Sequence, residues 1–407
     1  MIILPSAFSG KFEESDRVVH SVSHGRGRAA VSSRDRSHTA ALTYVAEDAP
    51  TGYGDAGDRM VRALRESGIT VEYRGVTEWR RVSEQRDTGV LPALIRHSRD
   101  DCAEDRAPRD APTVAHLVPE HYPVLRKLRR DGPLIGHTVW ETDRVPAHWP
   151  PLLNGVDGIV VPTEWNREVF RACGVTTPIS VVPHVACEPV PGDDGIQLGL
   201  PDDVVVFYTI SRWDERKAPW VTLRGFLEAF SADDPVALVV KTGQGQVGDR
   251  FPAIAVARLF GEYSRPPRVQ FEVGDWTDDR VAGLHARGDC FISLTHGEGW
   301  GIGAFDACAY GNPVVITGWG GQLEYLDADA GFLVDYDLVP VRHGASSYTS
   351  DQHWAEPRLD HAVELLRAVA ADSVAARRRA ATMLPRMRNE FAGPAVARRL
   401  TAAVWGP

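Results

Sequence analysis

A glycine-rich segment near residue 300 holds the residues whose types and spacing are best suited to chemistry. It runs from Thr295 to Val314 as THGEGWGIGAFDACAYGNPV and contains Glu298 and Asp306. An apolar run precedes it and a helix is predicted after it, so unpaired backbone N–H groups and the positive end of a helix converge on the loop. Such a loop suits an anion, and its two carboxylates suit sugar hydroxyls. Taken alone, the segment also fits a strand-to-helix turn whose glycines only relieve crowding.

The elements that must position this loop alternate between apolar runs and helix-like segments. In the first half of the chain the predicted strands are Ala41–Val45, Thr113–Val118, Leu134–Val139, Gly158–Val161 and Ile179–Val182, with a helix over Ala56–Ser67 and another apolar run after Gly68. In the second half they are Val204–Ile210, Val236–Lys241, Val269–Phe271, Cys290–Leu294 and Pro313–Thr317, with helices over Val221–Phe230, Asp278–Ala286, Ala304–Tyr310 and from about Leu359. This alternation predicts parallel sheets covered on both faces, which bind ligands beyond the carboxyl ends of their strands.

The length and the placement of turn residues predict the domains. A chain of 407 residues is expected to form two to three domains at about 150 residues each. Residues 187–203 are rich in Pro, Gly and Asp and are interpreted as the linker. We predict an extension or long loop over 1–39, one Rossmann-like domain over 40–190, a second over 200–385, and a C-terminal helix over 386–407 that returns to the first domain.

The composition excludes several classes of function. A net charge of −10 argues against a general affinity for nucleic acid or anionic membrane. Five cysteines without a Cys-x-x-Cys pair fit a reducing compartment, and no signal peptide or transmembrane stretch of ~20 apolar residues is recognisable. We therefore expect a cytoplasmic protein without a transmembrane segment. The sequence is compatible with a monomer or a homo-oligomer.

The segment around Glu298 resembles the signature of retaining glycosyltransferases with the GT-B fold, in particular the family 4 group. That signature has a Glu, seven residues and a second Glu; here Glu298 and Asp306 fill the two places. The resemblance implies an α/β GT-B fold, in which two Rossmann-like domains face each other across a cleft. It also implies that Glu298 binds hydroxyls of the donor sugar and that Asp306 binds the nucleotide ribose, although Asp is one methylene shorter than Glu. The neighbouring residues implied to bind the donor are Gly299, Trp300, Gly301 and Ile302.

Two further strand ends resemble elements of the same family. The segment SRWDERK (211–217) matches an Arg followed five residues later by a Lys, which implies that Arg212 and Lys217 clamp the diphosphate. Arg216 is interpreted as a bystander, and a solvated charged loop is the alternative for the whole segment.

The segment GGQLE (320–324) resembles the family's Gly-Gly-x-x-Glu. It implies that Gly320 and Gly321 let the backbone approach the donor sugar. Glu324 either binds or orients Lys217, or is a carboxylate at a helix start.

The resemblance is more diffuse in the first half of the chain. Gly52 and Gly54, in TGYG (51–54), correspond to a glycine loop that faces the acceptor and the diphosphate. In GHTVWETD (136–143), the resemblance implies a catalytic His137 that faces the cleft, with Glu141 or Asp143 shaping the acceptor side. A purely structural histidine is the alternative.

A competing acceptor-side set lies at the end of the strand Thr113–Val118. It consists of His116, Glu120 and His121. The segments VPTEWN (161–166) and VPH (182–184) also resemble family elements, but the Gly that should follow the second is missing, and both are interpreted as structural residues near the hinge.

The sequence therefore predicts a retaining hexosyltransferase that moves a sugar from a nucleotide diphosphate sugar to a hydroxyl of a small-molecule or glycan acceptor. No set with metal-ligand spacing is visible, so we expect no obligatory metal and no cofactor besides the nucleotide sugar as co-substrate. The alternatives are a nucleotide-sugar epimerase of the same fold and a non-catalytic nucleotide-sugar binding protein; an enzyme that joins a cyclitol would look the same. The arginine-rich composition and a subgroup resemblance favour a bacterial enzyme of secondary metabolism or surface glycan synthesis.

Overall fold

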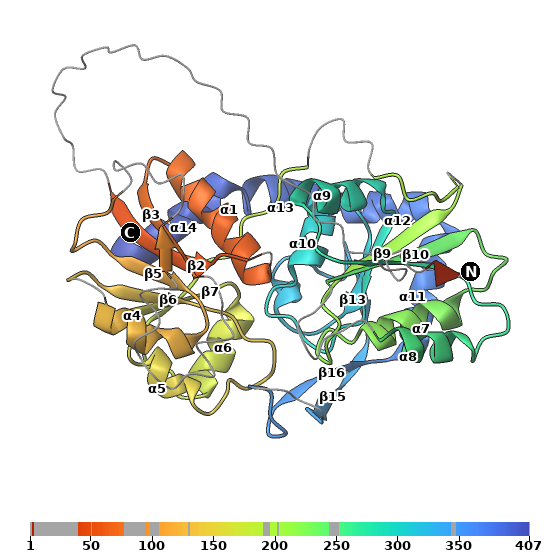
Figure 1. Cartoon of the computed structure of the whole chain (residues 1–407), viewed down its shortest axis with the longest axis horizontal. Helices are drawn as coiled ribbons and strands as arrows, with labels where there is room; N and C mark the ends of the chain where they lie inside the picture. The colour runs from red at the N-terminus through yellow and green to blue at the C-terminus, as the bar shows by residue number, and fades with distance from the viewer. Residues whose placement is uncertain are drawn as a thin grey trace, which may run out of the picture.

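The computed structural model describes residues 2–3, 40–49, 51–76, 95–97, 106–128, 131–189, 196–201, 203–243, 252–342 and 347–406. They form two α/β units that lie side by side, each built on a seven-stranded sheet (Figure 1). Within these ranges, no helix combines the length and the apolar character needed to cross a membrane.

The first unit contains a sheet with the strand order β4-β3-β2-β5-β6-β7-β8. The strands are β2 (Ala41–Glu47), β3 (Thr70–Val76), β4 (Ile95–His97), β5 (Thr113–His116), β6 (Leu134–His137), β7 (Gly158–Val161) and β8 (Ile179–Val181). All neighbours are parallel except β4, which is antiparallel to β3. The helices of this unit are α1 (Gly52–Glu66), η3 (Pro119–His121), α4 (Tyr122–Leu128), α5 (Trp149–Leu153) and α6 (Glu164–Ala172).

The second unit contains an all-parallel sheet with the order β1-β11-β10-β9-β12-β13-β14. Its strands are β1 (Ile2–Ile3), β9 (Val205–Ile210), β10 (Val236–Thr242), β11 (Arg268–Val273), β12 (Cys290–Ser293), β13 (Val314–Thr317) and β14 (Phe332–Val334). Its helices are α7 (Pro219–Ala229), α8 (Ala253–Phe260), α9 (Asp278–Arg287), α10 (Ile302–Ala309), η4 (Gly321–Glu324) and α11 (Leu359–Ala371). A hairpin of β15 (Tyr336–Pro340) and β16 (His353–Pro357) extends from its lower edge (Figure 1).

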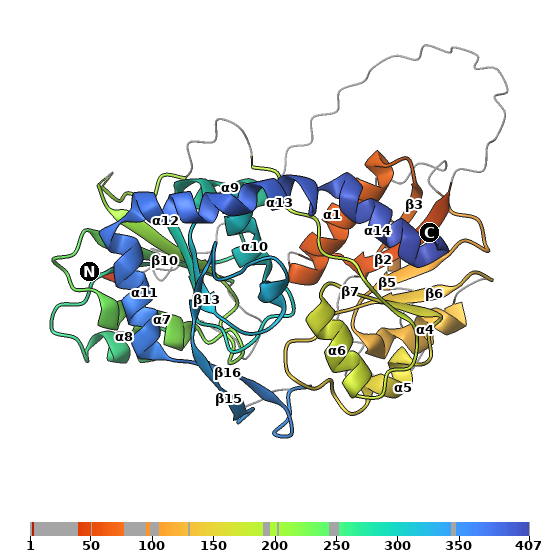
Figure 2. The same ribbon diagram turned by 180° about the vertical axis from the view of Figure 1, so that it is seen from behind.

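The C-terminal helices run back from the second unit to the first. They are α12 (Ser373–Ala380), η5 (Ala381–Met383), α13 (Leu384–Asn389) and α14 (Gly393–Trp405). Figure 2 shows them running along the top of both units, on the side that faces the viewer. Val396 and Leu400 of α14 are buried in one apolar cluster with Leu42 of β2 and Leu64 of α1. Fully burying side chains of this size contributes about 1.5–3 kcal/mol each, so α14 is held firmly on the first unit.

The continuous apolar strands explain why each sheet is covered on both faces. The strand β10, with the sequence VALVVKT, has buried residues at nearly every position. Strands buried on both faces are typical of parallel sheets with helices on each side. The α/β class, the two Rossmann-like units and their parallel sheets are as predicted from the sequence.

The structure corrects the predicted start of the first helix. Residues 51–54 do not form a glycine loop, because α1 begins at Gly52 and the hydroxyl of Thr51 accepts a hydrogen bond from Gly54 N. Thr51 is therefore an N-cap, which satisfies a backbone donor in the first turn. Gly54 is required by close packing, since a Cβ there would lie 2.0 Å from the carbonyl oxygen of Ala49.

The predicted extension over 1–39 lies mostly outside the described residues. Its exception is Ile2–Ile3, whose backbone pairs in parallel with Val269 and Gln270 of β11 and adds an edge strand to the second sheet. These two residues are therefore part of a sheet and not of a loop.

Candidate active site

The glycine-rich loop after β12 lies against the first unit. A Cβ at Gly297 would lie 2.2 Å from the carbonyl oxygen of Glu141, and a Cβ at Gly299 would lie 2.0 Å from Cγ2 of Val139. Gly301 has a φ of 86°, a left-handed conformation that favours glycine, and it directly precedes α10. Contact between the two units therefore demands glycine at 297 and 299, and the backbone conformation favours glycine at 301, in addition to any approach to a ligand.

Glu298 lies buried in this loop and is paired with two cations. Lys217 Nζ donates to both of its carboxylate oxygens at 2.7 Å, and Arg216 Nη1 lies 3.3 Å from Oε2. Burial works to raise the pKa of Glu298, but Lys217 and Arg216 outweigh it and lower that pKa below its usual value. Glu298 is therefore ionised at neutral pH, and the predicted sugar-binding and phosphate-binding residues lie in direct contact.

Arg216 is part of this buried group, so the interpretation of it as a bystander was wrong. Its Nη1 donates to the carbonyl oxygen of Gly297 at 2.7 Å, and its Nη2 lies 3.6 Å from Glu141 Oε1 of the first unit. Arg216 thus holds the loop around Glu298 and links it to the other unit. The sequence offered no signal for this role, because a charged run is usually solvated.

Arg212, the other predicted clamp residue, follows β9 and is in a different environment. Its side chain is 69% exposed and is paired at 3.0 Å with Asp214. The structure therefore does not bring Arg212 into the buried group of Lys217 and Glu298. Its guanidinium can turn toward a ligand at little cost, because an exposed ion pair contributes only about 0–1 kcal/mol.

Asp306, on α10, forms a bidentate ion pair with Arg59, on α1 of the first unit. The two guanidinium nitrogens lie 2.6 and 2.7 Å from the two carboxylate oxygens. Burial works to raise the pKa of Asp306, but Arg59 lowers it below its usual value. Figures 1 and 2 both show α1 and α10 meeting where the two units join. Sequence reasoning missed Arg59, because an arginine on an amphipathic helix carries no sign of a distant partner.

The turn after β13 also contacts both units. Gly321 N donates to the carbonyl oxygen of Glu298 at 2.7 Å, and Gly320 has a φ of 104°. Glu324 Oε2 accepts a hydrogen bond from the backbone N of Glu164, the first residue of α6, at 2.9 Å. Glu324 is therefore a carboxylate at a helix start, for a helix of the other unit, and its described hydrogen bonds do not include Lys217.

Glu141 and Asp143, predicted on the acceptor side, contact the second unit. Glu141 Oε2 accepts a hydrogen bond from the hydroxyl of Tyr348 at 3.0 Å. Asp143 Oδ1 accepts one from the backbone N of His353 at 2.6 Å. Both carboxylates thus help to join the units.

The predicted histidines lie at the carboxyl ends of neighbouring strands. His116 ends β5 and His137 ends β6, and the parallel register pairs them directly. Their rings stack at 3.8 Å, both are buried, and burial lowers the pKa of each well below its usual value. His137 is therefore a fully buried, neutral ring at the end of β6, where the sequence predicted a ring facing the cleft.

Two other predicted residues pack mainly inside their own units. Glu120 Oε1 lies 2.9 Å from Trp149 Nε1 and 2.7 Å from His148 Nε2, which fastens the start of α5. The Trp300 ring packs against Phe305 and Tyr325 in the core of the second unit. The Trp300 ring also meets the ring of His184, from the first unit, edge-on at 5.3 Å.

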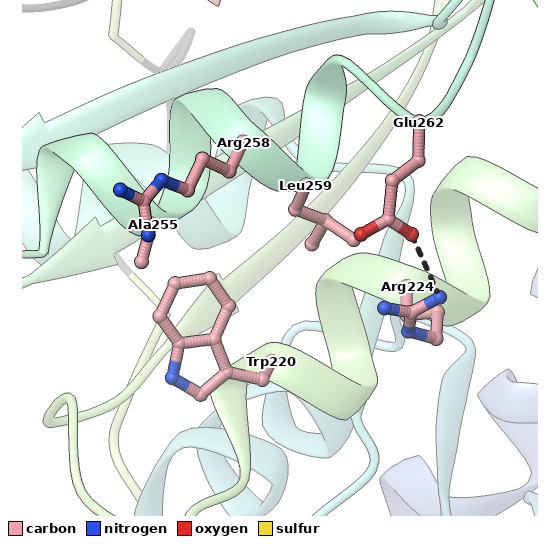
Figure 3. A pocket seen from close by; sticks show the side chains of 6 residues that line it. All are labelled: Trp220, Arg224, Ala255, Arg258, Leu259 and Glu262. Carbon is pink, nitrogen blue, oxygen red and sulfur yellow. Dashed lines mark hydrogen bonds and ion pairs between the residues drawn. The ribbon is translucent and has the colours of Figure 1, made fainter.

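A separate pocket of about 320 Å³ lies between α7 and α8 on the outside of the second unit. Figure 3 shows Trp220 and Arg224 of α7 facing Arg258 and Leu259 of α8, with an ion pair between Arg224 and Glu262. Its lining contains none of the residues described above, so it is not the candidate active site.

Known proteins resemble this chain in structure, but none of those compared matches it in sequence. No protein-family model and no curated protein sequence matches the chain. Sucrose-phosphate synthase from Thermosynechococcus elongatus matches with a TM-score of 0.64 and 15% identity, covering 89% of this chain and 97% of that one. HepE from Anabaena in complex with UDP-glucose matches with a TM-score of 0.62 and 13% identity, covering 89% and 98%.

A third structure that matches belongs to a longer protein. The chain spans 56% of TarM from Staphylococcus aureus, in a complex that includes UDP; the match covers 73% of this chain at a TM-score of 0.54 and 12% identity. At these identities the likeness shows the fold, which is GT-B, as the motif around Glu298 predicted.

Proposed function

We propose that the chain is a retaining glycosyltransferase that moves a sugar from a nucleotide diphosphate sugar to a hydroxyl of a small-molecule or glycan acceptor. The observation that carries the proposal is the contact between Lys217 and Glu298, at the carboxyl ends of β9 and β12, where the second unit meets the first. It joins a phosphate-binding cation to a sugar-binding carboxylate on a GT-B fold. The structural neighbours crystallised with UDP or UDP-glucose support a nucleotide diphosphate as donor.

The ion pair of Lys217 and Glu298 suggests how a donor binds. An incoming diphosphate offers Lys217 a more highly charged partner than a single carboxylate does. When Lys217 turns to the diphosphate, the lone pairs of Glu298 become free to accept hydrogen bonds from sugar hydroxyls. Arg216 remains beside Glu298 and keeps it ionised, so donor binding does not leave a buried carboxylate without a cation.

Asp306 keeps its proposed contact with the ribose, but Arg59 limits it. Each carboxylate oxygen has two lone pairs, and Arg59 uses one on each. The Cys187 thiol also hydrogen-bonds to Asp306, so one lone pair remains that can accept a ribose hydroxyl without breaking the ion pair. Binding of the nucleotide and contact between the units are then coupled through one side chain.

The proposed reaction needs no metal ion at the diphosphate. The acceptor oxygen attacks the anomeric carbon on the face from which the diphosphate departs, the bond from that carbon to the phosphate oxygen breaks, and a phosphate oxygen takes the acceptor proton. Lys217 and Arg212 offset the charge that develops on the leaving diphosphate. Exclusion of water from the closed junction limits hydrolysis of the donor.

The test is to incubate the chain with each nucleotide sugar, a pool of hydroxyl acceptors and EDTA. Phosphorus NMR measures release of the nucleoside diphosphate, and proton NMR measures the coupling of the new anomeric proton. We expect release of the diphosphate and a product with the anomeric configuration of the donor. An inverted anomer would contradict the retaining assignment, and a donor epimerised without acceptor would establish the epimerase instead. Activity that appears only when a metal replaces EDTA would overturn the metal-free proposal.

A further inference from the structure

Three buried histidines of the first unit gather in a cluster that the proposed reaction does not use as a whole. His116 and His137 end β5 and β6, and His184 follows β8. One ring nitrogen of each lies within 4.8 Å of the others. Because parallel strands end at the same edge of a sheet, residues far apart in the sequence meet there, and their spacing along the chain gives no metal-binding signature.

The chemistry of the cluster suits a metal ion. All three side chains are buried imidazoles, and the neutral imidazole ring has one nitrogen with a lone pair to donate to a metal. His137 Nε2 and His184 Nδ1 are buried without a hydrogen-bond partner among the described residues. Buried polar atoms in native proteins almost always have a hydrogen-bond partner, so these two nitrogens are candidates to bind a ligand.

A neighbouring tyrosine orients two of the rings. The hydroxyl of Tyr44 lies 2.9 Å from His116 Nδ1 and 3.4 Å from His137 Nδ1. A hydrogen bond to one ring nitrogen sets the tautomer and directs the other nitrogen toward a metal, as outer partners of metal-bound histidines usually do. Tyr44 therefore leaves Nε2 of His116 and of His137 as the donor atoms.

We propose that His116, His137 and His184 form a binding site for a late first-row divalent metal ion, with Zn²⁺ as the first candidate. Imidazole ligands favour Zn²⁺, Co²⁺, Ni²⁺ and Cu²⁺, whereas Mg²⁺ and Ca²⁺ favour oxygen ligands. The inference goes beyond the proposed function and does not rest on it, because it concerns the first unit and not the diphosphate.

Binding requires one ring to turn. Zinc–nitrogen bonds are about 2.0–2.1 Å long, and the lone pairs of two parallel stacked rings point in parallel directions, so they cannot both reach one ion. His137 is the freer ring, because its contact with Tyr44 is the longer one.

The test measures metal binding by the full chain without a histidine tag. After removal of metals with EDTA and dialysis, the protein is titrated with Co²⁺, whose visible absorption distinguishes four-coordinate from six-coordinate sites, and then with Zn²⁺ in competition. Elemental analysis gives the stoichiometry. We expect each chain to bind one metal ion tightly and to show the Co²⁺ spectrum of a four-coordinate site. Binding should be at least ~100-fold weaker in His137→Gln and in His184→Gln. His121→Gln is the matched control, since His121 is a buried histidine outside the cluster, and it should bind as the wild type does.

Two results would overturn the proposal. One is a wild-type chain that binds no metal ion tightly, which would mean that the cluster is only a packed stack of neutral rings. The other is equal binding in the cluster variants and the wild type, which would place the ion elsewhere. If the variants do not fold, ¹⁵N-histidine NMR of the wild type decides: Zn²⁺ must shift the ring nitrogens of three histidines among the 14 in the chain, and a spectrum without such shifts contradicts the site.

Discussion

The ion pair between Arg59 and Asp306 should hold the two units together. Removal of one partner from a buried pair leaves a charge without compensation, at a typical cost of about 3–5 kcal/mol. Because the side chain of Arg59 is 20% exposed, we expect the lower end of this range. Arg59→Gln should therefore lower the free energy of unfolding by about 3 kcal/mol at pH 7. Asp306→Asn should cost somewhat less, because the unpaired Arg59 can reach water.

A double-mutant cycle isolates the interaction itself. The Arg59→Gln, Asp306→Asn double variant carries no unpaired buried charge, so its loss should be smaller than the sum of the single losses by about 2–3 kcal/mol. Arg358→Gln is the matched control. Arg358 also forms a bidentate pair, with Asp337, but both side chains are more than half exposed, so its loss should be small beside that of Arg59→Gln.

The assay is urea unfolding, followed by circular dichroism and by tryptophan fluorescence. Coincident transitions are needed, because a chain with two units does not always unfold in one step. The pKa of Asp306 is lowered in the folded chain, so the contribution of the pair is present at neutral pH and disappears as the pH falls through that pKa. Additive losses, or a loss in Arg59→Gln no larger than in Arg358→Gln, would refute the reasoning.

Three further predictions follow from the site. Arg212→Ala and Lys217→Ala should each weaken binding of the nucleoside diphosphate by about 1.5–3 kcal/mol in calorimetric titrations, and unchanged affinities would remove the clamp assignment. Asp55 lies in the first turn of α1, and burial disfavours its charged form and raises its pKa to about 6. Asp55→Asn should therefore stabilise the fold by about 1–2 kcal/mol above pH 6 and not at all below about pH 4, which thermal melts at the two pH values check. Gly299→Ala should destabilise the chain by about 1–3 kcal/mol because its Cβ would overlap Val139, and Val139→Ala in the same chain should recover part of that loss in urea unfolding.

Local patterns in the sequence were enough to predict the elements of the fold. The strand Gly158–Val161 was predicted with the bounds that the structure gives it, and α9 and α11 begin at the predicted Asp278 and Leu359. Apolar runs that alternate with amphipathic segments mark these elements directly. The start of α1 was missed because two glycines suggested a loop, whereas the hydroxyl of Thr51 caps a helix there.

Contacts between the units could not be predicted in the same way. Glu298 and Lys217 were both singled out from motifs, but their direct ion pair depends on how two strand ends meet in space. Arg59 contacts Asp306 only because α1 of one unit lies against α10 of the other. The histidine cluster depends likewise on strand order, which places the ends of β5, β6 and β8 near one another.

The most direct test of the proposed donor site is a thermal-shift screen with UDP, GDP, ADP, TDP and their sugar conjugates in the presence of EDTA. A ligand at about 100 times its Kd adds roughly 2.7 kcal/mol to the stability of the folded state, which a melting curve resolves. We predict that one nucleotide series raises the Tm of the wild type and that Lys217→Ala loses most of that rise. The absence of a shift with every series, or an equal shift in Lys217→Ala, would contradict a metal-free nucleotide-sugar site built on Lys217 and Glu298.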